Sequence, residues 1–220
     1  MPVNPNAAIS ITAFNWVPPF AQGQVRDLRV RWALEEAGLD YAERLLDPRE
    51  PRPDAYHAEQ PWGQVPVFRE GELSLFESGA IVLHIGGRSE ALLPCDAAGR
   101  TKATQWLIAA LNSIEPSAMQ LLTIDIFAAG EAWTVERRPQ VAEFLDKRLA
   151  RLADALGSRD WLEDRFTAGD LMMSTVLRIP PPDMLADHPK LTSYKSRCEA
   201  RPAFARALEA QIAAFQCEPA

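Results

Sequence analysis

Two neighbouring stretches of the chain carry residue types suited to holding a small charged ligand. Residues 64–68 place a proline inside an apolar run, and residues 74–81 place Glu77 and Ser78 ahead of a second apolar run. Together they predict a strand, a turn at residues 70–72, a second strand and the start of a helix. Ser78 suits a helix N-cap, and the free N–H groups at a helix N-terminus favour an anion. A ligand carboxylate could lie there while Glu77 accepts a hydrogen bond from an ammonium group, which indicates a small, charged, peptide-like ligand.

The proline at position 66 adds a second feature. An X-Pro bond adopts the cis form at modest cost, and a cis proline commonly marks a tight turn. A cis bond after Val65 would turn the Val65 backbone outward and leave its N–H and C=O free to pair with an extended peptide. The alternative is that Pro66 is an ordinary strand-edge proline and that Ser78 only caps its own helix. Periodicity does not decide between the two.

This segment resembles the glutathione-binding half of the glutathione transferase family. In that family a cis proline follows the residue whose backbone pairs with the cysteinyl part of glutathione. An acidic residue followed by serine then holds the γ-glutamyl end. By position, the resemblance assigns the backbone role to Val65 and the γ-glutamyl role to Glu77 and Ser78.

The resemblance also suggests residues for the glycyl carboxylate of glutathione. Gln64 falls where the family often has a polar side chain near this carboxylate. Arg49 and Arg52 lie in the preceding loop, where the family gathers basic side chains, and either could form a bidentate pair. Arg52 is favoured by its distance from Gln64. The alternative is that both arginines are solvated loop charges.

Three further motifs extend the resemblance along nearly the whole chain. Residues 29–38 resemble the family's first helix, residues 166–170 its late capping motif and residues 201–204 its usual ending. The implied activity is that of a glutathione transferase, with glutathione as co-substrate and no metal. The implied partner is a small hydrophobic electrophile or a peroxide, in a detoxification role, and the implied assembly is a homodimer.

The chain departs from the family where the glutathione sulfur would be activated. A free thiol has a pKa of about 8.5, so a transferase must stabilise the thiolate. Many family members use Tyr, Ser or Cys at the start of the first helix, but residues 15–28 contain none of these, nor Thr. No cysteine is therefore placed for thiol exchange on the protein. The subclass stays open.

The remaining candidates for activating the sulfur lie in that same window. Arg26 is the first choice, because a guanidinium supplies both charge and hydrogen-bond donors. Gln24 is a weaker candidate, since it is a donor only. Asn15, the Trp16 indole and the helix amides are also open. The alternative for Arg26 is an exposed helix arginine paired with an acidic neighbour.

Composition limits the other function classes. The chain has 220 residues, 47% of them hydrophobic and 24% charged, enough apolar residues for a real core. A net charge of −7 argues against nucleic acid as the main partner, although three arginines at positions 26, 29 and 31 cluster. Three cysteines and three histidines show no metal-ligand spacing. No signal peptide or membrane span is evident, so we expect a cytoplasmic protein without a membrane partner.

The pattern along the chain predicts two domains. Residues 1–88 alternate strand and helix signals and form the expected thioredoxin-like, glutathione-binding domain. Residues 89–97 form a linker, and residues 98–220 show almost only helical spacing. Thr167 and Asp170 form a predicted capping box at the start of one helix. The fold class is therefore α/β followed by all-α, the glutathione transferase fold.

Two functions from different classes follow. The first is a glutathione-dependent transferase or peroxidase. The second is a non-catalytic module of the same fold, serving in binding or regulation, which the missing Tyr, Ser or Cys favours.

Overall fold

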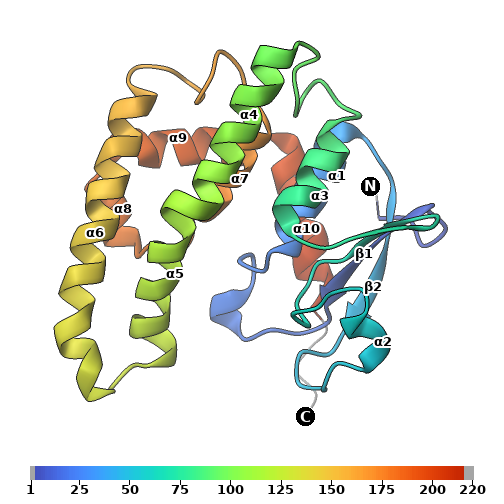
Figure 1. The fold of residues 1–220 in the computed structure, drawn as a ribbon, viewed down its shortest axis with the longest axis horizontal. Helices are drawn as coiled ribbons and strands as arrows, with labels where there is room; N and C mark the ends of the chain where they lie inside the picture. Colours follow the sequence, from blue (N-terminus) through green and yellow to red (C-terminus); the bar gives the residue numbers. More distant parts are fainter. Residues whose placement is uncertain (1–2, 216–220) are drawn as a thin grey trace. The chain divides into compact units, whose positions relative to one another are not determined.

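The computed structural model describes residues 3–215, which form two compact packing units. One unit contains the residues up to Leu93 together with those from Arg201 onward, and the other is Pro94–Ala200. In the first unit the chain alternates strands and helices in the predicted order (Figure 1). The second unit is helical throughout its regular elements.

A mixed four-stranded sheet forms the centre of the first unit. Its strands are β1 (Ile9–Phe14), β2 (Tyr41–Leu46), β3 (Phe68–Glu70) and β4 (Leu73–Leu75). Their order is β2-β1-β3-β4, with β1 parallel to β2 and β3 antiparallel to both β1 and β4. This arrangement confirms the thioredoxin-like fold. The third strand was predicted to begin near Val65 and instead begins at Phe68.

Four α-helices accompany this sheet. They are α1 (Asp27–Ala37), α2 (Asp54–His57), α3 (Ser78–Gly86) and α10 (Pro202–Ala214), with a short 3₁₀ turn at Pro19–Ala21. Gly38 ends α1 in the left-handed conformation at φ 66°, as its position after the helical pattern predicts. The predicted N-cap role of Ser78 is wrong, because Ser78 is already the first helical residue and Glu77 holds the cap position.

Helix α10 packs against α1, so the end of the chain belongs to the first packing unit. The rings of Trp32 and Phe204 meet edge-on at 4.8 Å between centroids. Arg201 pairs with Glu36 and Arg206 with Glu35, each at 2.6 Å. The sequence places residues 98–220 in one helical domain. In the structure α10 packs with the first unit instead, because these aromatic and charged contacts hold it against α1.

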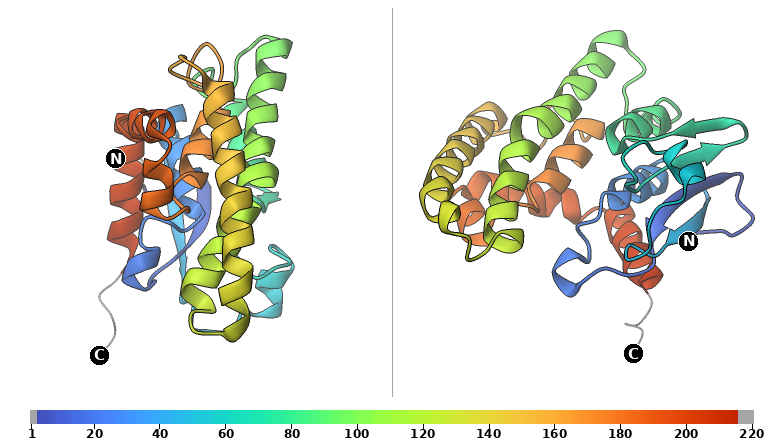
Figure 2. Two further views of the ribbon diagram at one scale, coloured as in Figure 1. Left: turned by 90° about the vertical axis from the view of Figure 1, so that its left-hand side faces the viewer. Right: turned by 60° about the horizontal axis from the view of Figure 1, so that its bottom comes forward.

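Helical hairpins build the second unit, which Figure 2 shows from two further sides. Its helices are α4 (Ala97–Ala109), α5 (Glu115–Leu122), α6 (Ala132–Leu156), α7 (Ala168–Val176), α8 (Pro182–Ala186) and α9 (Pro189–Glu199). Single π-helical turns at Ala110–Ile114 and Thr123–Phe127 join α4 to α5 and extend α5. The all-helical prediction is confirmed for this unit.

The sequence predicts no membrane span, and the continuous helical run Ala97–Phe127 bears on that expectation. By length and composition it could cross a membrane, with a mean hydropathy of 1.2 over its most apolar window. Core helices of soluble proteins satisfy the same criterion, and 44% of that window is buried. Helix α7 packs on α4 so closely that a side chain at Gly169 would meet Trp106 at 2.7 Å. The packing therefore fits a core helix.

The capping box at the start of α7 is confirmed. The Thr167 hydroxyl accepts a hydrogen bond from the Gly169 N–H at 3.2 Å, and the Asp170 carboxylate accepts one from the Thr167 N–H at 2.9 Å. Asp170 also accepts from the Leu162 N–H and from the Tyr194 hydroxyl, at 2.9 and 3.0 Å. Burial raises the pKa of Asp170, while these donors lower it. The carboxylate thus joins three chain segments.

A buried charged cluster fixes the beginning of α1. Asp27, the first helical residue, accepts a hydrogen bond from Arg31 Nε at 2.7 Å, and both side chains are almost inaccessible. Arg31 also pairs with Glu43 on β2. Gln211 on α10 donates to Asp27 at 2.7 Å and to the Val25 carbonyl at 3.1 Å. These bonds connect the N-terminus of α1 to β2 and α10.

Replacing Arg31 with methionine should destabilise the protein strongly. The change leaves the Asp27 carboxylate buried without its ionic partner, which typically costs about 3 kcal/mol or more of unfolding free energy. Urea denaturation of wild type and variant measures the loss. Arg151→Met is the control, since Arg151 is 85% exposed and pairs with Asp154 on the surface. It should change stability by less than about 0.5 kcal/mol, and an equal loss in both variants would contradict the expectation.

Candidate functional site

The backbone around Val65 leaves two polar groups available for a ligand. The bond between Val65 and Pro66 is cis, and both side chains are buried. Within the described residues, neither the N–H nor the C=O of Val65 takes part in a backbone hydrogen bond. An extended peptide could therefore pair with both groups as an added strand would.

The residues on either side of this dipeptide are tied down. The Thr12 N–H donates to the Val67 carbonyl at 2.9 Å, and the Val67 N–H donates to the Thr12 hydroxyl at 2.6 Å. On the other side, the Tyr56 hydroxyl donates to the Gln64 carbonyl at 2.6 Å. Sequence reasoning missed Thr12 and Tyr56. The signal was a polar threonine at a buried position of an otherwise apolar strand.

A second polar feature lies at the N-terminus of α3. Ser78 is 4% exposed, and its hydroxyl accepts a hydrogen bond from Arg29 Nη1 at 3.3 Å. Because the guanidinium occupies a lone pair, the Ser78 proton is available for a further acceptor. Arg29 is buried too and was predicted only as part of the first helix. N–H groups, a hydroxyl and a buried cation together make this helix end suitable for a carboxylate.

Glu77 stands directly before this helix in an unusual conformation. Its φ is 69° and its ψ is 112°, and it is the one described residue other than glycine with positive φ. Such a conformation costs about 1–3 kcal/mol in a residue with a Cβ and is concentrated at functional sites. The side chain is exposed and makes no capping hydrogen bond. Its carboxylate is thus accessible beside the N-terminus of α3.

The two candidate arginines for the glycyl carboxylate differ in their partners. Arg49 pairs with the Asp47 carboxylate at 2.5 Å, and its hydrogen bonds lower the Asp47 pKa to about 2. Arg52 donates to the Asp47 carbonyl at 2.8 Å and lies over the Phe14 ring at 5.5 Å. In residues 3–215, no carboxylate lies within ion-pair distance of Arg52. Arg52 is therefore the better candidate of the two. Gln64, the predicted polar side chain for the same carboxylate, is exposed.

The candidates for sulfur activation lie between β1 and α1. Arg26 is partly exposed and occupies the N-cap position of α1, with φ −65° and ψ −17°. Gln24 is exposed in the turn before it. Asn15 follows β1, and its Oδ1 atom is buried without a partner in the described part of the chain. The ring of Trp16 lies under the Arg49 guanidinium, 5.4 Å from its centroid.

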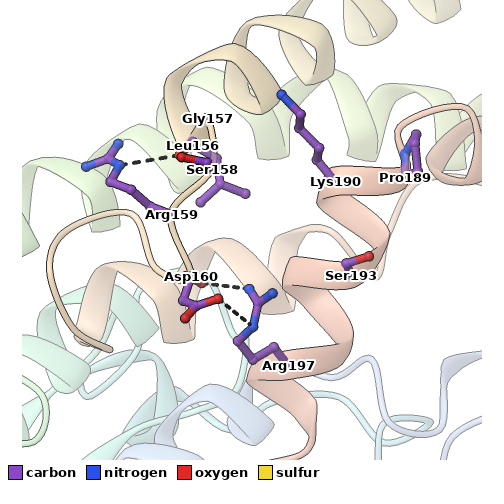
Figure 3. Close-up of a pocket in the computed structure, with 9 residues that line it drawn as sticks. All are labelled: Leu156, Gly157, Ser158, Arg159, Asp160, Pro189, Lys190, Ser193 and Arg197. Carbon is purple, nitrogen blue, oxygen red and sulfur yellow. Dashed lines mark hydrogen bonds and ion pairs between the residues drawn. The ribbon is translucent and has the colours of Figure 1, made fainter.

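A pocket of about 320 Å³ lies in the second unit, between the end of α6 and helix α9 (Figure 3). Arg159 donates to the carbonyls of Ala155 and Leu156, at 2.6 and 3.3 Å. Arg197 pairs with Asp160 at 3.3 Å. Protein oxygens already occupy both guanidinium groups, and the pocket contains none of the predicted site residues.

Comparisons with known proteins identify the family of the chain. The family model "Glutathione S-transferase, N-terminal domain" matches residues 11–87, a range that includes Arg52, Val65 and Ser78. Glutathione S-transferase 3 of Zea mays is 32% identical over 201 residues, covering 83% of this chain and 88% of that protein. The chain belongs to the glutathione transferase family.

Solved structures of this family share the fold. A glutathione transferase from Burkholderia graminis, solved with two glutathione molecules bound per subunit, is 25% identical. It superposes with a TM-score of 0.77 over 91% of this chain and 87% of its own. Glutathione transferase F7 from Populus trichocarpa is 20% identical, with a TM-score of 0.75 over 92% and 99% of the two chains.

Glycine at position 77 should relieve the strain that glutamate carries there. Glycine adopts positive φ freely, whereas alanine retains the Cβ conflict. We therefore expect Glu77→Gly to be about 1 kcal/mol more stable than Glu77→Ala, measured by urea denaturation. The same pair of changes at exposed Glu72, which has no positive φ, should show alanine equal to or better than glycine. An identical order at both positions would contradict the strain assignment.

Proposed function

We propose that this family member is an enzyme that binds glutathione in its first unit and activates the thiol. The activated thiol would attack a hydrophobic electrophile or reduce a peroxide. The observation that carries the proposal is the Val65 backbone, free of backbone partners, in the same unit as the anion-binding start of α3. The two features match the cysteinyl amide and the γ-glutamyl carboxylate of one tripeptide.

Each part of glutathione has a complementary group. The N–H and C=O of Val65 would pair with the cysteinyl residue. The α3 amides and the Ser78 hydroxyl would take the γ-glutamyl carboxylate, and Glu77 would accept from the adjacent ammonium. Arg52, assisted by Gln64, would pair with the glycyl carboxylate.

Activation of the sulfur requires stabilisation of the thiolate over the thiol. Lowering the thiol pKa by two units corresponds to about 2.7 kcal/mol of selective stabilisation. Arg26 at the start of α1 combines a permanent charge with the positive end of the helix dipole. We assign the activating role to Arg26, with Gln24 as a neutral donor in second place. Conjugation forms a carbon–sulfur bond and expels the leaving group of the electrophile.

Peroxide reduction would use the same thiolate differently. The thiolate attacks one peroxide oxygen, and the O–O bond breaks to give glutathione sulfenic acid and an alkoxide, which takes a proton from water and leaves as the alcohol. The thiol of a second glutathione then attacks the sulfenic sulfur, which gives glutathione disulfide and releases water. The Burkholderia graminis relative was solved with two glutathione molecules bound per subunit, and peroxide reduction consumes two. This route is therefore a second reaction to test. Assays with an aromatic electrophile and with a hydroperoxide distinguish the two reactions. Binding without either reaction would favour a non-catalytic binding or regulatory module.

The family resemblance also supports a cytoplasmic homodimer with a role in detoxification. A homodimer would have twice the 24.4 kDa mass of one chain, which light scattering after size-exclusion chromatography measures directly.

Replacing Glu77 with alanine should weaken glutathione binding by about tenfold or more, because an ammonium would lose its charged acceptor. Isothermal titration calorimetry measures the dissociation constant. Glu72→Ala is the matched control, since Glu72 is exposed in the turn between β3 and β4. An unchanged affinity in Glu77→Ala would show that the γ-glutamyl site is misassigned. No binding to the folded wild type would refute the proposed function itself.

Replacing Arg26 with alanine should raise the pKa of the bound glutathione thiol by about one to two units, since a nearby cation is lost. The ultraviolet absorbance of the thiolate, followed against pH with glutathione bound, measures this pKa without a second substrate. Glutathione affinity at low pH should change little. An unaltered thiol pKa in Arg26→Ala would transfer the role to Gln24 or to the α1 amides, and Gln24→Ala then tests the first of these.

A further inference from the structure

A continuous series of hydrogen bonds encloses the Val65–Pro66 dipeptide. It begins at the Val67 N–H, which donates to Thr12 Oγ1 at 2.6 Å. Thr12 Oγ1 lies 3.1 Å from the Tyr56 hydroxyl oxygen, and Tyr56 donates to the Gln64 carbonyl at 2.6 Å. The series thus runs from the residue after Pro66 to the residue before Val65. We call it the hydroxyl relay.

Proton counting fixes the direction of every bond in the relay. A carbonyl cannot donate, so the single Tyr56 proton points at Gln64. The Tyr56 oxygen must then accept, and the Thr12 proton is the one available between the two hydroxyls. A Thr12 lone pair receives the Val67 N–H. Each hydroxyl therefore donates once and accepts once, and such chains strengthen by mutual polarisation.

Burial makes the relay hard to replace. Thr12 is fully inaccessible and Tyr56 is 5% exposed, so water does not readily substitute for either hydroxyl. Burial is also the main cause that raises the Tyr56 pKa, which keeps its proton in place at neutral pH. Removing one hydroxyl would leave a buried polar partner unsatisfied.

We propose that Thr12 and Tyr56 are positioning residues for glutathione, acting through the relay on the orientation of the Val65 N–H and C=O. This inference rests on the proposed glutathione site. Neither side chain would touch the ligand. Their effect is preorganisation: with Gln64 and Val67 fixed, the Val65 N–H and C=O keep one orientation before the ligand binds. Without the relay, the ligand would have to order this backbone as it binds.

Two substitutions at Thr12 separate the hydroxyl from packing. Thr12→Val keeps the shape and loses the hydroxyl, whereas Thr12→Ser keeps the hydroxyl and loses a buried methyl group. The relay predicts that Val weakens glutathione binding about tenfold while Ser stays within about twofold of wild type. A packing role predicts the reverse order, since the serine variant carries the cavity. Isothermal titration calorimetry of the folded proteins measures both.

Tyr56→Phe tests the other hydroxyl and needs no change of ring packing. It should weaken binding about tenfold, and the double variant with Thr12→Val should lose little more than either single one, because both break the same series. Tyr41→Phe is the matched control. Tyr41 is a buried tyrosine of the same unit whose hydroxyl contacts Arg31 at 3.4 Å, outside the relay. The Tyr41→Phe variant should bind glutathione with the affinity of the wild type.

Amide hydrogen exchange gives a readout that needs no ligand. The Val67 amide should lose protection in Thr12→Val but keep it in Thr12→Ser and Tyr41→Phe. Wild-type affinity in both Thr12→Val and Tyr56→Phe would overturn the positioning role and leave the glutathione site standing. Equal weakening by Thr12→Ser and Thr12→Val would also overturn it. A folded wild type that binds no glutathione would refute the proposed function and this inference together.

Discussion

The backbone at residues 64–67 must satisfy two opposing demands. Buried N–H and C=O groups need hydrogen-bond partners, yet Val65 has to keep both of its groups unpaired if a peptide is to pair with them. The chain meets the first demand at Gln64 and Val67 with two side-chain hydroxyls from β1 and α2. Ordinary strand pairing resumes only at Phe68. The late start of β3 is therefore the structural condition for a ligand to take the place of a neighbouring strand.

The three arginines in and directly before α1 have different surroundings. Arg31 is buried in the cluster with Asp27 that fixes the helix start, and Arg29 is buried against the Ser78 hydroxyl. Only Arg26 of the three is partly exposed. The sequence suggests a small basic patch at these three arginines, but two of them, Arg29 and Arg31, are buried. The charges of Arg29 and Arg31 link α1 to the beginning of α3 and to the sheet, and Arg26 stands at the N-cap of α1.

Local patterns predicted the elements well and the contacts between them poorly. The strand from Ile9, the end of α1 at Gly38 and the capping box at Thr167 follow from residue types within a few positions. The bond between Thr12 and Tyr56 joins residues 44 positions apart, and the Arg29–Ser78 bond spans 49. No propensity encodes such pairings.

Two further differences have the same origin. Ser78 has the residue type of an N-cap, but Glu77 holds that position at positive φ, a conformation that local preference disfavours. Helix α10 reads as one more helix of the second domain, and its contacts with α1, among them those of Phe204, Arg206 and Gln211, place it in the first unit. The strained backbone of Glu77 and the tertiary packing of α10 overrule the local signal in these two places.

The absence of Tyr, Ser, Thr and Cys from residues 15–28 has a physical consequence for the proposed chemistry. A neutral hydroxyl stabilises a thiolate through one short hydrogen bond, which dissolved salt hardly affects. A guanidinium acts mainly through its charge, and salt screens a partly exposed charge within about 10 Å at 0.1 M ionic strength. On the proposed assignment of Arg26, the thiol pKa would therefore depend on ionic strength. Exclusion of water around Arg26 by a bound second substrate would strengthen the same interaction, so that thiol activation and substrate binding support each other.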